Sequence, residues 1–122
     1  MNQILIVEDE PDMAATYERL LRRAGHRVVT AASHAEGLRL LESLRPRLVI
    51  SDLRLADGDG LEIIRAARAL ERPPVVIAIT AFASRGTRQA ALDAGASAFL
   101  AKPFSIAEFS SLVESLIERG DH

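Results

Sequence analysis

The sequence predicts an α/β protein built on a doubly wound parallel sheet of five strands. Five short apolar runs alternate with segments whose apolar residues recur three or four positions apart, which is the spacing of one helix face. The connections are short, so each strand–helix–strand unit needs a right-handed crossover, and helices must cover both faces of the sheet. The chain has 122 residues, of which 48% are hydrophobic, enough to enclose one core. We therefore expect one domain over residues 1–122.

The first two strands are expected at residues 4–7 (ILIV) and 27–32 (RVVTAA). The helix between them should begin near Pro11, because the N–H that proline lacks is left unpaired in the first helical turn anyway. Gly25 is its expected stop, since glycine readily takes the backbone conformation that ends helices. Ser33 follows the second strand and is expected to cap the next helix, whose apolar face carries leucines.

The third and fourth strands are expected at residues 48–51 (LVIS) and 75–79 (VVIAI). Asp52 closes the third strand, and a loop rich in Gly and Asp (LADGDG) follows it. A helix from about residue 61 to about residue 70 should then end before Pro73 and Pro74, because proline cannot continue a helix.

An alanine-rich helix at residues 83–94 and a strand at 98–101 (AFLA) continue the alternation, and a last helix capped by Ser105 completes it. Gly86 lies near the start of the alanine-rich helix, and the core-facing side chains of this helix are small. We expect it to be weakly held and easily displaced.

The order of the strands follows from how apolar each run is. The runs at 4–7, 48–51 and 75–79 are the most continuous, as expected of central strands buried on both sides. The runs at 27–32 and 98–101 are shorter or more polar, which suits the edges. This pattern favours the order 2-1-3-4-5, the flavodoxin-like arrangement.

Polar side chains follow four of the strands at the points where these strands end. Glu8 and Asp9 close the first strand, Asp52 the third, Thr80 the fourth and Lys102 the fifth. In a doubly wound sheet, ligands bind beyond the carboxyl ends of the strands, near the point where strand order reverses, so we expect these side chains to meet there. Lys102 is also the single lysine among 15 Lys and Arg residues, which suggests a role that arginine cannot fill.

The residue types at these positions indicate one kind of chemistry. Clustered carboxylates raise one another's pKa unless a positive charge lies between them. Mg²⁺ is the economical answer, because it binds through one or two carboxylates and keeps waters and a phosphate oxygen as its other ligands. A lysine and a hydroxyl beside it would then bind an incoming anion. The pattern predicts a phosphoryl site on a carboxylate.

Each of these residues alone has a plainer explanation. An aspartate at a strand end usually caps a turn or helix, a threonine hydroxyl there is usually satisfied locally, and a single lysine is usually a solvated charge. Because all of them occupy strand ends in one alternating pattern, we favour the joint functional interpretation.

The composition argues against several other classes. A net charge of −2 with no basic cluster along the sequence argues against direct nucleic-acid binding by this domain. The absence of cysteine excludes disulfides, thiol nucleophiles and cysteine metal sites. The first apolar run is short and is followed at once by acids, and no run approaches membrane-spanning length. We expect a cytoplasmic domain that does not contact a membrane.

In this order and spacing, the motifs resemble the receiver domain of bacterial two-component response regulators over essentially the whole chain. The segment ILIVEDEP resembles the family's first strand with its acidic pair, and LVISDLRLADGDGLE resembles the phosphoacceptor strand and loop. The segment VIAITAFA resembles the part that carries the switch hydroxyl, and ALDAGASAFLAKPF resembles the run into the last strand. The resemblance implies a signalling switch of a phosphorelay that takes a phosphoryl group from a histidine kinase or phosphotransfer protein. It implies no enzyme activity beyond self-phosphorylation and slow autodephosphorylation.

The resemblance also implies a role for each site residue. Asp52 would be the phosphoacceptor. Asp9 and Asp52 would bind Mg²⁺, or Mn²⁺ in its place, together with the backbone carbonyl of Arg54, and Glu8 would act through water. Lys102 would contact a phosphoryl oxygen.

Activation is expected to act through a switch. Thr80 would move toward the phosphoryl group and let Phe99 rotate inward, which reshapes the face formed by the fourth helix, the fifth strand and the fifth helix. That face would control an output domain or a downstream protein, and homodimerisation through it on activation is left open. The peptide bond between Lys102 and Pro103 is expected to be cis.

Two positions depart from the family pattern. Ala56 stands where the family usually has proline, four residues after the acceptor. Arg54, two residues after it, has a side chain that could overhang the site, and our hypothesis is that it changes the lifetime of the phosphoryl group.

Three alternative interpretations fit the sequence less well. A haloacid-dehalogenase-like phosphatase would also use Asp52 as its nucleophile, but it needs a second aspartate two residues later, where this chain has Arg54. A flavodoxin-like FMN protein needs a phosphate loop rich in hydroxyls and amides, where this chain has three acids in a row. An unphosphorylated, receiver-like adaptor would have no use for the full set of site residues.

Overall fold

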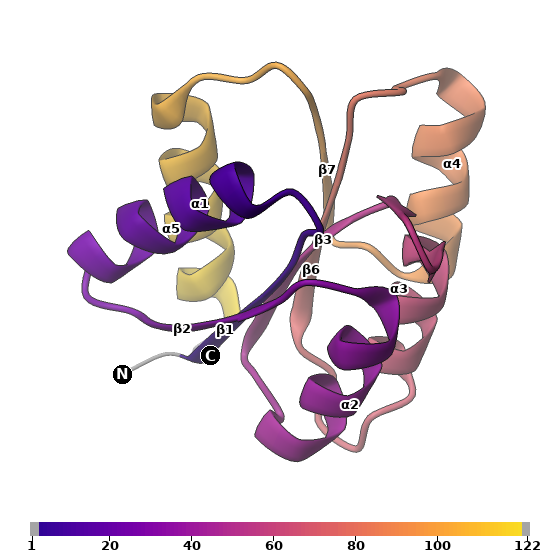
Figure 1. Ribbon diagram of the computed structural model, residues 1–122, viewed down its shortest axis with the longest axis horizontal. Coiled ribbons are helices and arrows are strands. Elements are labelled where there is room, and N and C mark those ends of the chain that lie inside the picture. The colour runs from indigo at the N-terminus through magenta and orange to yellow at the C-terminus, as the bar shows by residue number, and fades with distance from the viewer. Residues whose placement is uncertain (1–2, 121–122) are drawn as a thin grey trace.

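The computed structural model describes residues 3–120 and shows the predicted alternation of strands and helices (Figure 1). The main sheet has five parallel strands in the order β2-β1-β3-β6-β7, which confirms the predicted order 2-1-3-4-5. A separate antiparallel pair, β4 and β5, follows the third strand. The elements in chain order are β1 (Gln3–Val7), α1 (Pro11–Arg23), β2 (Arg27–Ala31), α2 (His34–Leu44), β3 (Leu48–Asp52), β4 (Arg54–Leu55), β5 (Gly58–Asp59), α3 (Gly60–Arg68), β6 (Val75–Thr80), α4 (Arg85–Ala94), β7 (Ala98–Ala101) and α5 (Ile106–Gly120).

Helices cover both faces of the sheet. Side chains of β1 alternate between the two faces, as the period of a strand requires. Ile4 and Ile6 belong to a core cluster with residues of α1 and α5, whereas Leu5 and Val7 belong to a second cluster with residues of α2, α3 and α4. Figure 1 shows the same division, with α1 and α5 on one side of the sheet and α2, α3 and α4 on the other. The predicted doubly wound arrangement is thereby confirmed.

Serine side chains fix the starts of three helices. The predicted caps Ser33 and Ser105 accept hydrogen bonds from the backbone N–H groups of Glu36, at 3.1 Å, and Glu108, at 3.0 Å. Ser84, which the sequence reasoning did not single out, caps α4 in the same way. Each cap satisfies one of the backbone donors that a helix start leaves unpaired.

The loop after Asp52 is more regular than the sequence predicts. Its residues form a short hairpin in which residues 54–55 pair with residues 58–59. Helix α3 begins directly afterwards at Gly60, where an added Cβ atom would collide with the carbonyl oxygen of Asp52. Only glycine permits so close an approach, so the hairpin returns the chain tightly against the end of β3.

None of the helices in residues 3–120 is long and apolar enough to cross a membrane. Their bounds otherwise match the predicted ones closely. Helix α3 ends at Arg68, about two residues early, and α4 begins at Arg85, about two residues late. Gly25 and Gly95 follow α1 and α4 with φ angles of 96° and 118°, in the left-handed region that glycine enters without strain.

Candidate functional site

Glu8, Asp52 and Lys102 are brought together at the carboxyl ends of the strands. Glu8 directly follows β1 and Asp52 ends β3, and these two strands are neighbours in the sheet. Glu8 exposes only 3% and Asp52 only 7% of its surface. Two carboxylates this deeply buried need a positive partner, because an unpaired charge away from water is very costly.

Lys102 supplies that partner. Its Nζ donates a hydrogen bond to Oδ2 of Asp52 at 2.8 Å and another to Oε1 of Glu8 at 3.2 Å. Burial alone would lower the pKa of Lys102, but the hydrogen bond and charge of Asp52, followed by those of Glu8, outweigh burial and raise the pKa above its ordinary value. The ammonium group therefore stays charged at neutral pH.

The two carboxylates are held differently. Burial, followed by the charge of Asp52, raises the pKa of Glu8, while the charge of Lys102 lowers it in part. The second oxygen of Glu8 accepts the backbone N–H of Glu10 at 3.3 Å. Oδ1 of Asp52 accepts the backbone N–H of Arg54 at 2.9 Å, which orients this carboxylate relative to the hairpin.

Asp9 lies at the rim of the site. It is only half-buried, and its Oδ2 accepts the backbone N–H of Ala56 at 2.8 Å, a bond that joins the segment before α1 to the hairpin turn. No three acidic or imidazole side chains within residues 3–120 are grouped closely enough to form a metal cage by themselves. Mg²⁺ ordinarily needs only one or two carboxylates and completes its shell with water and other oxygens, so Asp9 and Asp52 fit it chemically.

Thr80 ends β6 beside the buried ion pair and is 1% exposed. Its Oγ1 accepts the backbone N–H of Phe82 at 3.1 Å, and its carbonyl oxygen accepts the backbone N–H of Lys102 at 2.9 Å. A cavity of 320 Å³ lies beside it, between the hairpin and the start of α4. The hydroxyl is therefore held by a local hydrogen bond, and Thr80 is one of the residues that line this cavity.

Phe82 is a neighbour of the site that the sequence reasoning missed. It is 60% exposed, and the guanidinium carbon of Arg54 lies 4.2 Å from the centre of its ring, a cation–π contact. The side chain of Arg54 thus has a specific partner. An aromatic residue two positions after the hydroxyl is visible in the sequence, but no pattern there shows that two loops bring it under an arginine.

Phe99, the expected switch aromatic, lies on β7, the strand next to the one that Thr80 ends. It is half-buried against the core cluster of α2, α3 and α4. In the β6–β7 register Phe99 is opposite Ala78 and Thr80 is opposite Ala101, so the two residues are offset by two positions on adjacent strands. The peptide bond between Lys102 and Pro103 is cis.

This combination of sheet order and acidic edge is that of the CheY-like α/β signalling domains. The family model described as response regulator receiver domain matches residues 4–114, and the chain belongs to that family. Receiver domains are the phosphorylation-controlled switches of two-component signalling.

Two relatives illustrate the range of similar proteins. The chain is 37% identical to the transcriptional regulatory protein PrrA of Mycobacterium tuberculosis over 117 residues, which cover 96% of this chain and 50% of PrrA. It is 38% identical to the KDP operon transcriptional regulatory protein KdpE of Escherichia coli over 119 residues, which cover 98% of this chain and 52% of KdpE. The chain thus spans about half the length of these relatives.

Solved receiver structures superpose closely. The receiver domain of the sensor histidine kinase PA1611 from Pseudomonas aeruginosa is 37% identical with a TM-score of 0.86, covering 96% of this chain and 98% of that one. That structure has a magnesium ion coordinated in its active-site cleft. The receiver domain of HemR from Leptospira biflexa is 31% identical with a TM-score of 0.89, covering 96% of this chain and 94% of that one.

Proposed function

We propose that this chain is a phosphorylation-activated switch in which Asp52 accepts a phosphoryl group from the phosphohistidine of a histidine kinase or phosphotransfer protein. The observation that carries the proposal is the 2.8 Å pairing of a buried carboxylate, at the end of a central strand, with the single lysine of the chain. A cation in that position is already placed for the oxygens of a phosphoryl group on Asp52.

The transfer forms one bond and breaks one. A carboxylate oxygen of Asp52 attacks phosphorus in line, the new P–O bond forms, and the P–N bond to the donor histidine breaks as the imidazole leaves. The backbone N–H of Arg54 on Oδ1 keeps the carboxylate oriented. Lys102 transfers its hydrogen bonds from the carboxylates to a phosphoryl oxygen.

Asp9 and Asp52 would hold Mg²⁺ together with the backbone carbonyl of Arg54, Glu8 would reach it through water, and Mn²⁺ would substitute for it. When bound, the metal supplies positive charge that offsets the clustered carboxylates and the phosphoryl oxygens. The donor set of hard oxygens supports this, as does the magnesium ion in the cleft of the PA1611 receiver domain.

Metal binding can be tested without any reaction. Mg²⁺ at about ten times its Kd should stabilise the unphosphorylated protein by about 1.4 kcal/mol in urea unfolding, because it binds only the folded state. Asp9→Asn should lose most of this stabilisation. Asp12→Asn, which changes an exposed acid in the first turn of α1, should retain it. Equal stabilisation of both variants would refute the assigned ligands.

Thr80 would carry the signal from the acceptor to the surface. Moving its hydroxyl toward Asp52 breaks the 3.1 Å bond from the Phe82 N–H and so releases the segment that leads into α4. Of the ten residues of α4, all of them described, only Ala91 is buried, so this helix can shift at small cost. With Phe99 moving inward, the face of α4, β7 and α5 would present a changed surface to an output domain or downstream protein.

Phosphoryl acceptance is tested with acetyl phosphate as a small donor. In the presence of Mg²⁺ the protein should gain the mass of one phosphoryl group, and a chelator should prevent the gain. Asp52→Asn should remain unmodified, whereas Asp12→Asn should be modified like the unaltered protein. Equal modification of Asp52→Asn would contradict the proposed function.

A further inference from the structure

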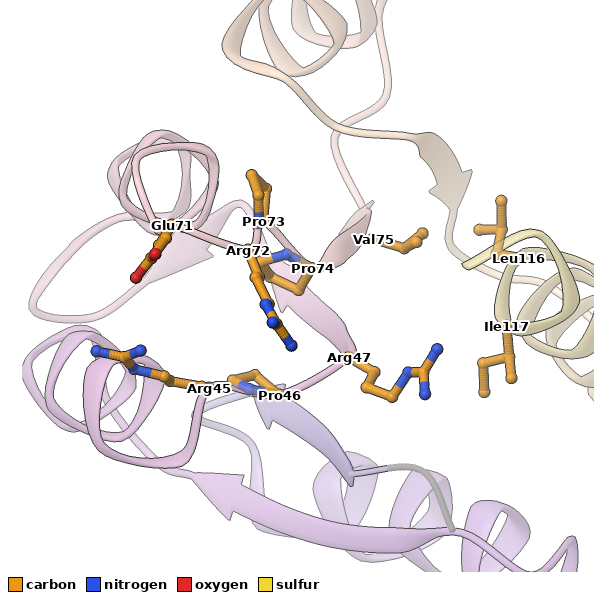
Figure 2. Close-up of a pocket in the computed structure, with 10 residues that line it drawn as sticks. All are labelled: Arg45, Pro46, Arg47, Glu71, Arg72, Pro73, Pro74, Val75, Leu116 and Ile117. Carbon is orange, nitrogen blue, oxygen red and sulfur yellow. The ribbon is translucent and has the colours of Figure 1, made fainter. Parts of the chain in front are cut away.

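A second cavity lies at the amino-terminal ends of β3 and β6, whereas Asp52 lies at the carboxyl end of β3. It has a volume of 620 Å³ and is formed by the loops that precede β3 and β6, together with the carboxyl-terminal half of α5 (Figure 2). Three arginines, three prolines and one glutamate are among its lining residues. The volume is in the range of pockets that bind small molecules.

The two loops are built alike and are fastened to each other. Leu48 of β3 pairs with Val75 of β6, and an Arg-Pro dipeptide begins three residues before each of them. The backbone N–H of Val75 donates to the carbonyl oxygen of Arg47 at 3.0 Å, which joins one loop to the other. Proline fixes its own φ angle, so the walls of this cavity are stiff. The cavity is therefore part of the fold itself.

Two arginines of the cavity, Arg45 and Arg72, carry the charge argument. Glu71 is the single acidic residue in its lining, and within residues 3–120 neither Arg45 nor Arg72 forms an ion pair or a side-chain hydrogen bond. The negative end of α2 partly offsets Arg45, which directly follows that helix. Arg72 lies four residues beyond the last residue of α3, where the negative end of the helix dipole no longer offsets its charge. Two like charges with a single acidic residue in the same lining favour an added anion.

The backbone at Arg45 gives independent support. Its φ angle is 49°, the one positive φ of a non-glycine residue among those the structure describes. Glycine is the usual residue at such a helix end, because a side chain there adds strain. An arginine is thus placed at this rim in spite of its conformational cost, which points to a use for its side chain.

The remaining wall of the cavity is apolar. Pro46 and Pro74 are buried, and Leu116 and Ile117 of α5 expose 5% and 8% of their surface. Figure 2 shows the Arg72 side chain extending into the space between Pro74 and Pro46. Arg72 is itself exposed, so its guanidinium group is accessible to a ligand, and the apolar wall beside it suits the body of an amphiphilic anion.

We propose that this cavity binds a small organic anion in which a phosphate, phosphonate or carboxylate group is attached to a compact apolar body. The anionic group would bind Arg72 and Arg45, and the body would pack against Pro74, Leu116 and Ile117. This site goes beyond the phosphoryl switch and does not depend on it, since the two sites lie at opposite ends of the strands.

Phenylphosphonate is a suitable probe because it carries both parts and cannot donate a phosphoryl group. Titration of the unphosphorylated full chain without Mg²⁺, followed by amide NMR, should give saturable shifts centred on Arg45, Arg47, Arg72 and Val75, the non-proline residues of segments 45–47 and 72–75, and little change at Thr80 or Lys102. Benzoate distinguishes a carboxylate ligand from a phosphonate ligand. Inorganic phosphate and benzyl alcohol supply the anion and the apolar body separately, and each should bind at least about tenfold more weakly.

Matched arginine variants complete the test. Arg72→Gln should weaken phenylphosphonate binding by about tenfold or more, the loss expected for a charged hydrogen-bond donor. Arg19→Gln, on the exposed face of α1, should leave binding unchanged, and the amide spectrum of each variant verifies its fold. The proposal is overturned if phenylphosphonate gives no saturable shifts at these residues. It is also overturned if inorganic phosphate or benzyl alcohol binds as well as phenylphosphonate, or if both variants weaken binding equally.

Discussion

Lys102 places a compact ammonium group between two buried carboxylates while only 14% of its own side chain is exposed. A guanidinium group is planar and wider, and it requires bidentate geometry. We expect Lys102→Arg to slow phosphorylation by acetyl phosphate about tenfold, the effect of losing about 1.4 kcal/mol of transition-state stabilisation. The amide shifts that beryllofluoride and Mg²⁺ induce in α4 and β7 should shrink as well. Normal rates and normal shifts would mean that only charge is required here.

Arg54 of β4 and Phe82, which lies two residues after the end of β6, are joined by a cation–π contact of 4.2 Å. If the stack shields an aspartyl phosphate from water, breaking it shortens the lifetime of that group. Arg54→Ala and Phe82→Leu should each speed the loss of the phosphoryl group roughly two- to fivefold, as expected for a contact of about 0.5–1 kcal/mol.

The decay is measured by intact mass after the donor has been removed. The double variant should decay no faster than the single variants, because both remove the same contact. If Arg54→Ala leaves both phosphorylation and dephosphorylation unchanged, the hypothesis about Arg54 is wrong.

Glu8 makes the stability of the protein depend on pH. Burial and then the charge of Asp52 raise its pKa, so the folded state favours the protonated carboxyl. That contribution is fully present below the pKa of Glu8 in the unfolded chain and is lost as the pH rises through the folded pKa. Glu8→Gln should therefore stabilise the metal-free protein by up to about 1 kcal/mol at pH 7.

The gain from Glu8→Gln should disappear below about pH 4, where the carboxyl is protonated in both states. Urea unfolding at the two pH values measures it. A variant that is less stable at pH 7 would show that the ion pair with Lys102 outweighs the cost of burying the charge.

At the scale of elements, α3 and α4 differ in how tightly they are held, and one glycine in each tests the difference. A Cβ at Gly60 would collide with the backbone of Asp52, so Gly60→Ala should destabilise the protein by about 1–3 kcal/mol. At Gly86 the nearest atom to an added Cβ is the Ser84 hydroxyl oxygen, 3.9 Å away. Gly86→Ala should therefore stabilise α4 by up to about 1 kcal/mol. Denaturant midpoints that rank the two variants in the reverse order would contradict this account.

The elements of the main sheet could be predicted from the sequence because each has its own periodic signal. The run from Ile4 to Val7 is continuously apolar, and the caps Ser33 and Ser105 precede helical patterns. The β4–β5 hairpin could not be predicted, because strands of two residues are too short to show an alternating pattern. The hairpin is followed at once by a tertiary contact, the close approach of Gly60 to the end of β3, which no local pattern in the sequence shows.

At the scale of the whole molecule, topology explains which site residues could be predicted. Glu8, Asp52 and Lys102 follow strands whose order fixes where they meet, so their proximity follows from the fold. Contacts between loops follow from no such rule. The bond from Ala56 to Asp9 is one example, and the stack of Arg54 on Phe82 is another.

The arginine-lined cavity shows the same limit. No basic run is present in the sequence, because the arginines belong to two loops that are far apart along the chain. The register of β3 and β6 brings these loops together at the amino-terminal ends of the two strands. A cluster of this kind is a property of the whole molecule, and it becomes visible only when the strands are paired.

The central claim is that Asp52 is the residue that carries the phosphoryl group. Borohydride reduces an acyl phosphate to an alcohol, so a phosphorylated aspartate is converted to homoserine, which tandem mass spectrometry locates. After phosphorylation of the unaltered chain in the presence of Mg²⁺, we expect homoserine at position 52 and at no other acidic position. Homoserine at Asp9, Asp57 or Asp59 with Asp52 unmodified would contradict the account.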